Sequence, residues 1–120
     1  MKGLVIRPPW INMILAGDKT WEIRGSRTAK RGRIALIKSG TKTIVGACDL
    51  VDVIGPLSLP DLLANQARHR IPADRLRREG TPYRNTFAWV VAQPEAFPAP
   101  VPYDHPNGAV IWVDLPHLNL

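Results

Sequence analysis

A lysine, a glutamate and an arginine that could act together lie within the stretch from Gly17 to Arg24. Lys19 stands where a strand is expected to begin. Because side chains alternate along a strand, Glu22 and Arg24 share one face with Thr20. The cations of such a group can bind phosphate or a base carbonyl, and its carboxylate can act in acid–base catalysis. The alternative is an exposed strand pair worth about 0–1 kcal/mol.

The flanking sequence predicts the elements that hold this group. Apolar residues at helical spacing after Pro8-Pro9 predict a helix over residues 9–16. Gly17 is expected to end that helix in a left-handed conformation. In the strand that follows, Trp21 and Ile23 are expected to face the core.

The rest of the chain is typical of a mostly β domain with a helical insertion. Apolar runs predict strands over residues 3–7, 20–25, 32–38, 43–54, 86–91 and 109–114. Ser58 can cap a short helix, and another helical turn is expected at 72–74, before a basic loop over 75–85. Gly46, inside a long apolar run, is expected to mark a bulge or bend.

Four prolines interrupt the stretch from residue 93 to 102, so this stretch is expected to run extended along a sheet edge rather than as a central strand. The expected fold class is α+β and mostly β. It is a small mixed β-barrel of five or six strands, with one early helix and one or two short helices in a mid-chain insertion. Residues 1–120 are expected to form a single domain.

Composition narrows the function classes. The chain of 120 residues has 45% hydrophobic and 22% charged residues, which are globular values. No apolar run is long enough to span a bilayer and no signal peptide is expected, so a cytoplasmic location without a membrane partner is predicted. Cys48, the only cysteine, lies in an apolar run and is expected to be buried. The three histidines lie far apart, and neither a metal nor a cofactor is predicted.

The formal net charge of +6 favours a polyanionic partner. The basic residues form two clusters. The first comprises Arg24, Arg27, Lys30, Arg31 and Arg33, and the second comprises Arg68, Arg70, Arg75, Arg77, Arg78 and Arg84. Either cluster can be a solvated surface or a phosphate-binding surface, and the composition leaves both interpretations open.

Three stretches in order resemble the ASCH domain. Arg7-Pro8-Pro9-Trp10 precedes the segment that carries the family signature of glycine, lysine, glutamate and arginine, at Gly17, Lys19, Glu22 and Arg24. The run from Phe87 to Val91 is similar to the family's aromatic strand. The stretches at 101–103 and 108–112 are similar to its C-terminal ending. The resemblance implies a PUA-like β-barrel that binds RNA or a nucleotide-like ligand in a cleft beside the early helix.

The resemblance also implies a site. Lys19, Glu22 and Arg24 are expected near the cleft. The expected wall residues are Arg7, Trp10 and Trp89, and the expected rim residues are Arg27, Arg31, Tyr103 and His105. In this hypothesis Lys19 and Arg24 face a phosphate or a base carbonyl, Glu22 orients Lys19 or accepts from an exocyclic amine, and a tryptophan stacks on a base. For each tryptophan, packing in the core is the other interpretation.

A second hypothesis is a small hydrolase. Some small ASCH proteins resemble amidohydrolases that remove an acetyl group from a modified cytidine, with a lysine at the position of Lys19 beside a threonine nucleophile. The threonine position is Glu22 in this chain, and a carboxylate is a poor substitute for an activated hydroxyl. Thr20 is a conceivable stand-in. Glu22 could instead act as a general base, tuned by Lys19, on another bond, including one in RNA.

A third hypothesis is a protein-interaction module that docks through residues 94–106. The position of the arginines discriminates between these hypotheses. Arginines that line the cleft beside Lys19 favour nucleic acid, whereas scattered arginines favour a small nucleoside or a protein partner. The sequence leaves the oligomeric state open.

Overall fold

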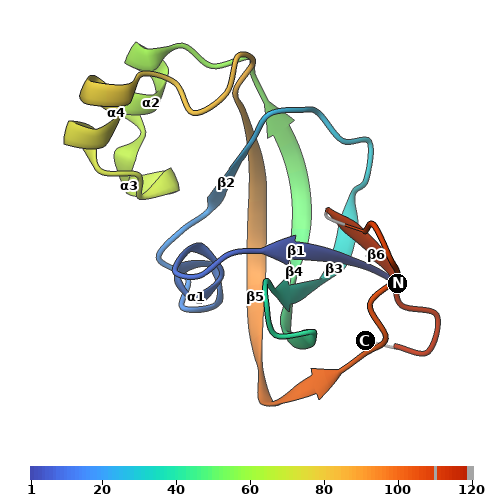
Figure 1. Cartoon of the computed structure of the whole chain (residues 1–120). Helices are drawn as coiled ribbons and strands as arrows, with labels where there is room; N and C mark the ends of the chain where they lie inside the picture. Colours follow the sequence, from blue (N-terminus) through green and yellow to red (C-terminus); the bar gives the residue numbers. More distant parts are fainter. Residues whose placement is uncertain (110, 119–120) are drawn as a thin grey trace.

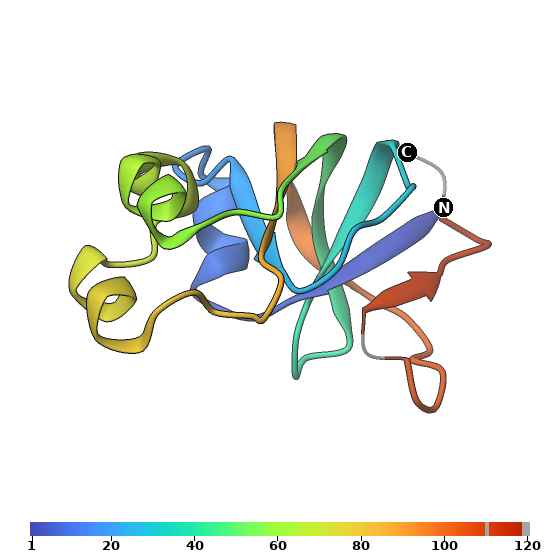
Figure 2. The same cartoon turned by 90° about the horizontal axis from the view of Figure 1, so that it is seen from above.

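One six-stranded mixed sheet forms the framework of the protein. The computed structural model describes residues 1–109 and 111–118. The strands are β1 (Lys2–Ile6), β2 (Trp21–Arg24), β3 (Gly32–Lys38), β4 (Thr43–Ile54), β5 (Phe87–Pro102) and β6 (Trp112–Asp114). Their order in the sheet is β2-β5-β4-β3-β1-β6. β1 runs parallel to β3, and the other neighbouring pairs are antiparallel. The sheet curls into a half-barrel, which confirms the expected small mixed barrel (Figures 1 and 2).

Within the described residues, four short helices accompany the sheet. They are α1 (Trp10–Leu15), α2 (Leu59–Ala64), α3 (Gln66–His69) and α4 (Ala73–Glu79). Helix α1 follows β1 and contacts β4 and β5, while α2, α3 and α4 gather at one end of the molecule, near β2 (Figure 1). In the described residues, no helix is both long and apolar enough to cross a membrane.

The helical insertion differs in detail from the expectation. It holds three helices rather than one or two, and residues 75–79 of the expected basic loop belong to α4. Leu76 explains the difference, since it is 1% exposed and anchors an otherwise basic turn in the core. Gly80, with φ of +79°, then ends the helix. Ser58 caps α2 as expected, and Asp61 completes a capping box with it.

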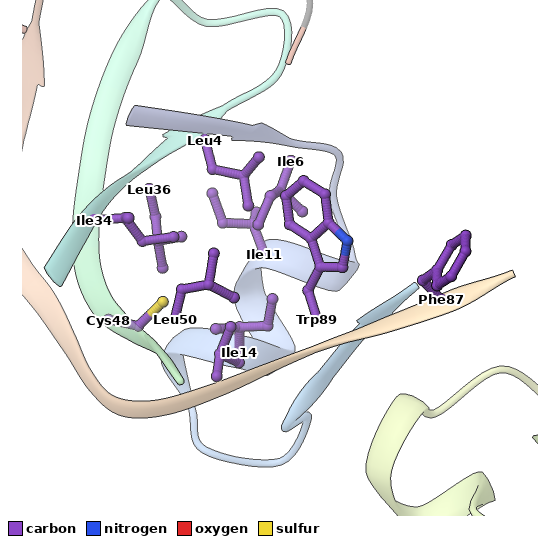
Figure 3. Close-up of a cluster of buried hydrophobic side chains, with 11 residues drawn as sticks. Leu4, Ile6, Ile11, Ile14, Ile34, Leu36, Cys48, Leu50, Phe87 and Trp89 are labelled. Atoms are coloured by element: carbon purple, nitrogen blue, oxygen red, sulfur yellow. The ribbon is translucent and has the colours of Figure 1, made fainter. Parts of the chain in front are cut away.

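The main core fills the half-barrel beneath α1. It consists of the buried side chains shown in Figure 3, which come from β1, α1, β3, β4 and β5. Cys48 is one of them, as expected, and burial raises the pKa of its thiol to about 12. The thiol therefore behaves as a small apolar group.

A second core joins the helical insertion to β2. Trp21 and Ile23 pack there with residues that include Leu62, Ile71 and Leu76. The two β2 side chains are thus core-facing, as the alternation predicts. Because they occupy that face, Glu22 and Arg24 project to the other.

Strand β5 combines two segments that the sequence suggests are separate. Residues 87–90 pair with β2 on one side and residues 88–92 pair with β4 on the other, while residues 95–102 pair with β4 alone. The proline-rich half is therefore a sheet edge, as predicted, although it continues the aromatic strand. Opposite it, the register shifts beside Gly46, which confirms the predicted bulge. A Cβ at Gly46 would lie 2.4 Å from the Glu95 carbonyl oxygen, so only glycine fits there without displacement.

Candidate functional site

A cleft of about 720 Å³ runs along the face that carries Glu22 and Arg24. This volume lies in the range of small-molecule sites. The walls come from the end of β1, the start of α1, β2, the turn between β3 and β4, the α3–α4 connection, and the loops before and after β5. The lining side chains include Arg7, Trp10, Lys19, Glu22, Arg24, Lys38, Lys42, Ile71, Arg75, Tyr83, Tyr103 and His105.

Lys19 is buried at the floor of this cleft. It is 2% exposed, and its Nζ donates to the carbonyl oxygens of Trp21 at 2.6 Å and His69 at 2.8 Å. Glu22 Oε1 lies 3.6 Å from the same nitrogen, and the ring centroid of Trp10 lies 5.0 Å away. The ammonium therefore links β2 to the end of α3 and also reaches the carboxylate.

The protonation of Lys19 is sensitive to this environment. Burial lowers its pKa from 10.5 to about 8, and the Glu22 carboxylate opposes that shift. Lys19 is therefore mostly charged at neutral pH but can exchange its proton in mildly alkaline solution.

Glu22 is 6% exposed and is held by Arg24. The Nε and Nη2 of Arg24 lie 3.0 Å and 2.9 Å from Glu22 Oε2, which leaves Oε1 facing Lys19. The arrangement is therefore a buried ion cluster rather than the exposed strand pair that was the alternative. Chemically, Oε1 can still accept a hydrogen bond from an N–H group of a ligand.

Arg24 also bridges the open side of the half-barrel. Its Nη2 donates to the Val5 carbonyl oxygen of β1 at 2.8 Å, and its guanidinium carbon lies 5.6 Å from the ring centroid of Trp89. The guanidinium is thus fixed both at β1 and at Glu22, so Arg24 holds Glu22 in place.

Seven of the predicted site residues line the cleft. They are Arg7, Trp10, Lys19, Glu22, Arg24, Tyr103 and His105. Tyr103 and His105 are joined to each other, because the tyrosine hydroxyl lies 2.7 Å from His105 Nδ1. His105 Nε2 lies 2.6 Å from the Ala109 carbonyl oxygen, which can only accept, so Nε2 carries the proton and Nδ1 accepts from the tyrosine.

Four predicted site residues do not line the cleft. Trp89 is 2% exposed in the main core, where its Nε1 donates to the Ser26 carbonyl oxygen, so it cannot stack on a ligand (Figure 3). Thr20 is exposed outside the cleft and is not placed as a nucleophile. Arg27 lies over Phe87, and Arg31 donates to carbonyl oxygens of its own loop. Each of these two arginines is thus engaged away from the cleft.

Among the charged and aromatic residues that line the cleft, sequence reasoning missed four, namely Lys38, Lys42, Arg75 and Tyr83. Lys38 and Lys42 flank a Ser-Gly turn, which gives no chemical signal by itself. Tyr83 is 44% exposed, and an aromatic residue after a proline in a polar loop was the available clue. Arg75 belongs to the second basic cluster, and nothing in the sequence separates it from its neighbours there.

Most of the two basic clusters lies elsewhere. Among their members, Arg24 and Arg75 line the cleft, and the others do not. By the criterion given above, this scattered distribution favours a small nucleoside or a protein partner over nucleic acid within the cleft.

Potential metal ligands do not gather in the part of the chain that the structure describes. Within residues 1–109 and 111–118, no three side chains of histidine, cysteine, aspartate or glutamate are close enough to hold an ion. His69 is buried, with Nε2 directed at the Leu62 carbonyl oxygen and Nδ1 accepting from the Ile71 amide. Burial lowers its pKa, so it is a neutral structural residue behind Lys19.

The structure is thus a small, mostly β domain with a cationic cleft beside an early helix. The chain belongs to the ASCH domain family, since the model of that family matches residues 4–100. No curated protein matches the chain.

Solved structures of the ASCH protein from Zymomonas mobilis share the fold. The protein itself is 18% identical, with a TM-score of 0.68 over 84% of this chain and 72% of that one. A tyrosine-to-phenylalanine variant gives 18% identity and a TM-score of 0.67, over 84% and 74% of the two chains. A serine-to-alanine variant gives 15% identity and 0.71, over 95% and 87%. The TM-scores, and not the low identities, establish the common fold.

Proposed function

We propose that this ASCH domain binds RNA or a nucleotide-like ligand in the cleft around Lys19, Glu22 and Arg24. The observation that carries the proposal is the charge pattern of the cleft. Among the lining residues that the structure describes, Glu22 is the one carboxylate, and it lies among basic and aromatic side chains. A nucleotide offers the matching groups, namely an anionic phosphate, a flat base and polar N–H donors.

Each part of the cleft has a role in this proposal. Glu22 Oε1 accepts from an exocyclic amine, as carboxylates do from cytosine. Trp10, which is half-buried, and Tyr83, which is exposed, offer faces on which a base can stack. The volume of about 720 Å³ accommodates a nucleotide. The resemblance of ASCH domains to RNA-binding modules also supports the proposal.

The test is a titration of a short single-stranded RNA, cytidine monophosphate and uridine monophosphate against wild type and Glu22→Gln. Loss of a charge-assisted hydrogen bond worth about 1.5–3 kcal/mol should weaken binding of the cytidine ligand about tenfold or more. The uridine ligand carries a carbonyl in place of the amine, so it should bind less tightly to wild type. The substitution Glu22→Gln should reduce its affinity less than that of the cytidine ligand.

Glu95→Gln is the matched control, because it replaces the same carboxylate by the same amide at a position outside the cleft. Thermal unfolding shows whether each variant folds. Should Glu22→Gln be too unstable, backbone amide chemical shifts of the wild type identify the binding surface directly. Absence of binding, or shifts confined to residues away from the cleft, would contradict the proposal.

The hydrolase remains a second candidate because of one observation. The Nζ of Lys19, whose pKa is about 8, lies 3.6 Å from Glu22 Oε1. Lys19 can therefore give up or accept a proton beside a bound ligand at mildly alkaline pH. A product assay on RNA and on acetylated cytidine decides it. Turnover that Glu22→Gln abolishes and Glu95→Gln retains would establish an enzyme, and binding without product would leave a recognition domain.

A further inference from the structure

Three cations gather at one end of the cleft, beside the turn between β3 and β4. The parallel pairing of β1 with β3 places Ile6 beside Lys38, and the Ser39 amide donates to the Ile6 carbonyl oxygen at 3.0 Å. This hydrogen bond holds the turn close to Arg7, the residue after Ile6. Lys42 closes the turn, and the side chains of Arg7, Lys38 and Lys42 all line the cleft.

These three cations differ from the other basic residues of the cleft in having no acidic partner among the described residues. Lys19 and Arg24 share Glu22, and Arg75 pairs with Glu79 at 3.0 Å. Arg7, Lys38 and Lys42 form no ion pair with any carboxylate in the part of the chain that the structure describes. The uncompensated positive charge of the cleft is therefore concentrated at the turn.

The opposite end of the cleft is apolar and aromatic in character. Ile71, Pro82 and Tyr83 line it, beside the already paired Arg75. Near the turn, Tyr103 and His105 do not offer their protons to a ligand, because the tyrosine hydroxyl and the Nε2 proton of His105 are used within their own loop. The three cations are therefore the main groups there that can bind an anion. The two ends thus differ both in charge and in polarity.

We propose that Arg7, Lys38 and Lys42 form a phosphate subsite, and that this subsite orients the ligand. A phosphate lies at the turn, and the base extends past Glu22 toward Tyr83. The proposal rests on the proposed function and adds to it the ligand class, namely a phosphorylated nucleotide rather than a free nucleoside. Two or three cations around a phosphate are a usual anion-binding arrangement.

The experiment compares cytidine with its 5′- and 3′-monophosphates by calorimetric titration. Wild type should bind at least one of the monophosphates about tenfold or more tightly than cytidine. The double variant Lys38→Gln/Lys42→Gln should lose most of that preference while its affinity for cytidine changes less than twofold. Lys30→Gln/Arg31→Gln removes the same charge from a loop outside the cleft, and it should keep the preference.

Inorganic phosphate separates this proposal from the proposed function. In the wild type it should compete with the monophosphate, and in the Lys38→Gln/Lys42→Gln variant it should not. Equal affinity of the wild type for nucleoside and monophosphates, or a preference that survives the double substitution, would overturn the phosphate subsite while leaving nucleoside recognition intact. Phosphate binding that depends on the two lysines, without binding of cytidine, cytidine monophosphates or RNA, would instead refute the proposed function.

Discussion

Lys19 has a structural role that its place in a family signature does not reveal. Its ammonium donates to one carbonyl oxygen on β2 and to another at the end of α3, so it attaches the helical insertion to the sheet. Leaving buried carbonyl groups without a donor costs about 1–3 kcal/mol. Loss of ligand binding in a Lys19 variant is therefore informative only beside a measurement of stability, and for this reason Glu22 is the better residue for testing binding.

The pKa of Lys19 yields a prediction about stability and pH. Its folded-state pKa of about 8 lies below the ordinary 10.5, so between these values the unfolded chain binds more protons than the folded one. The unfolding free energy of the wild type relative to Lys19→Ala should therefore rise as the pH increases from about 8 to about 10.5, by about 3 kcal/mol in total. Urea denaturation of the wild type and Lys19→Ala across this pH range measures the difference between their unfolding free energies. The contributions of titrating groups that both proteins share cancel in that difference. A difference independent of pH would contradict the burial of a charged Lys19.

Among the elements, the long pair of β4 and β5 shapes the half-barrel. Its bend occurs beside Gly46, where the Glu95 carbonyl oxygen and the Leu15 side chain would each lie 2.4 Å from an added Cβ. The backbone carbonyl cannot move aside without disturbing the β4–β5 pairing. The glycine therefore allows the bent strands and α1 to approach each other closely.

Gly46→Ala should lower the unfolding free energy by about 1–3 kcal/mol, the usual cost of overpacking. Chemical denaturation measures this change. Gly80→Ala is a useful comparison, because a Cβ there meets no atom within 4 Å and only the backbone conformation is strained. Unchanged stability of Gly46→Ala would show that the bend tolerates a side chain.

Elements with strong local signals were predictable from the sequence. The β-branched strands, the left-handed Gly17 and the Ser58 cap each depend on neighbouring residues, and the structure confirms them. Helix α4 was not foreseen because a buried Leu76, a tertiary contact, decides it. The outcome for the site was similar. The cluster around Glu22 was predictable because its members are close in sequence, whereas Lys38, Lys42 and Tyr83 join the cleft only through the fold.

At the scale of the whole molecule, ten of the sixteen lysine and arginine residues do not line the cleft. The helical insertion carries several of these ten as exposed arginines. Arg77 and Arg78 are 64% and 70% exposed at the side chain, and their nearest carboxylate oxygens lie 3.8 Å and 3.9 Å away. Such weak pairing leaves these guanidinium groups available for phosphates, and under the proposed function an RNA strand longer than the cleft would supply them.

Arg77→Ala/Arg78→Ala should therefore affect long and short ligands differently. Binding of a single-stranded RNA of about ten nucleotides should weaken. The slope of the logarithm of the binding constant against the logarithm of salt concentration should become less steep by about 0.7 for each phosphate that the variant no longer neutralises. Binding of a mononucleotide should not change. Titrations at two or more salt concentrations measure both effects. An unchanged salt dependence would indicate that the second basic cluster is a solvated surface.

The hydrogen bond from Arg24 to the Val5 carbonyl has a consequence for how the domain moves. A side chain, and not a backbone ladder, joins β2 to β1 on the open side of the half-barrel. The same guanidinium holds Glu22, the proposed acceptor for a ligand. A ligand that draws Arg24 or Glu22 toward itself must weaken this closure, and by reciprocity a domain with a looser closure binds that ligand more readily. Under the proposed function, ligand binding in the cleft and the strength of the contact between Arg24 and Val5 are therefore coupled.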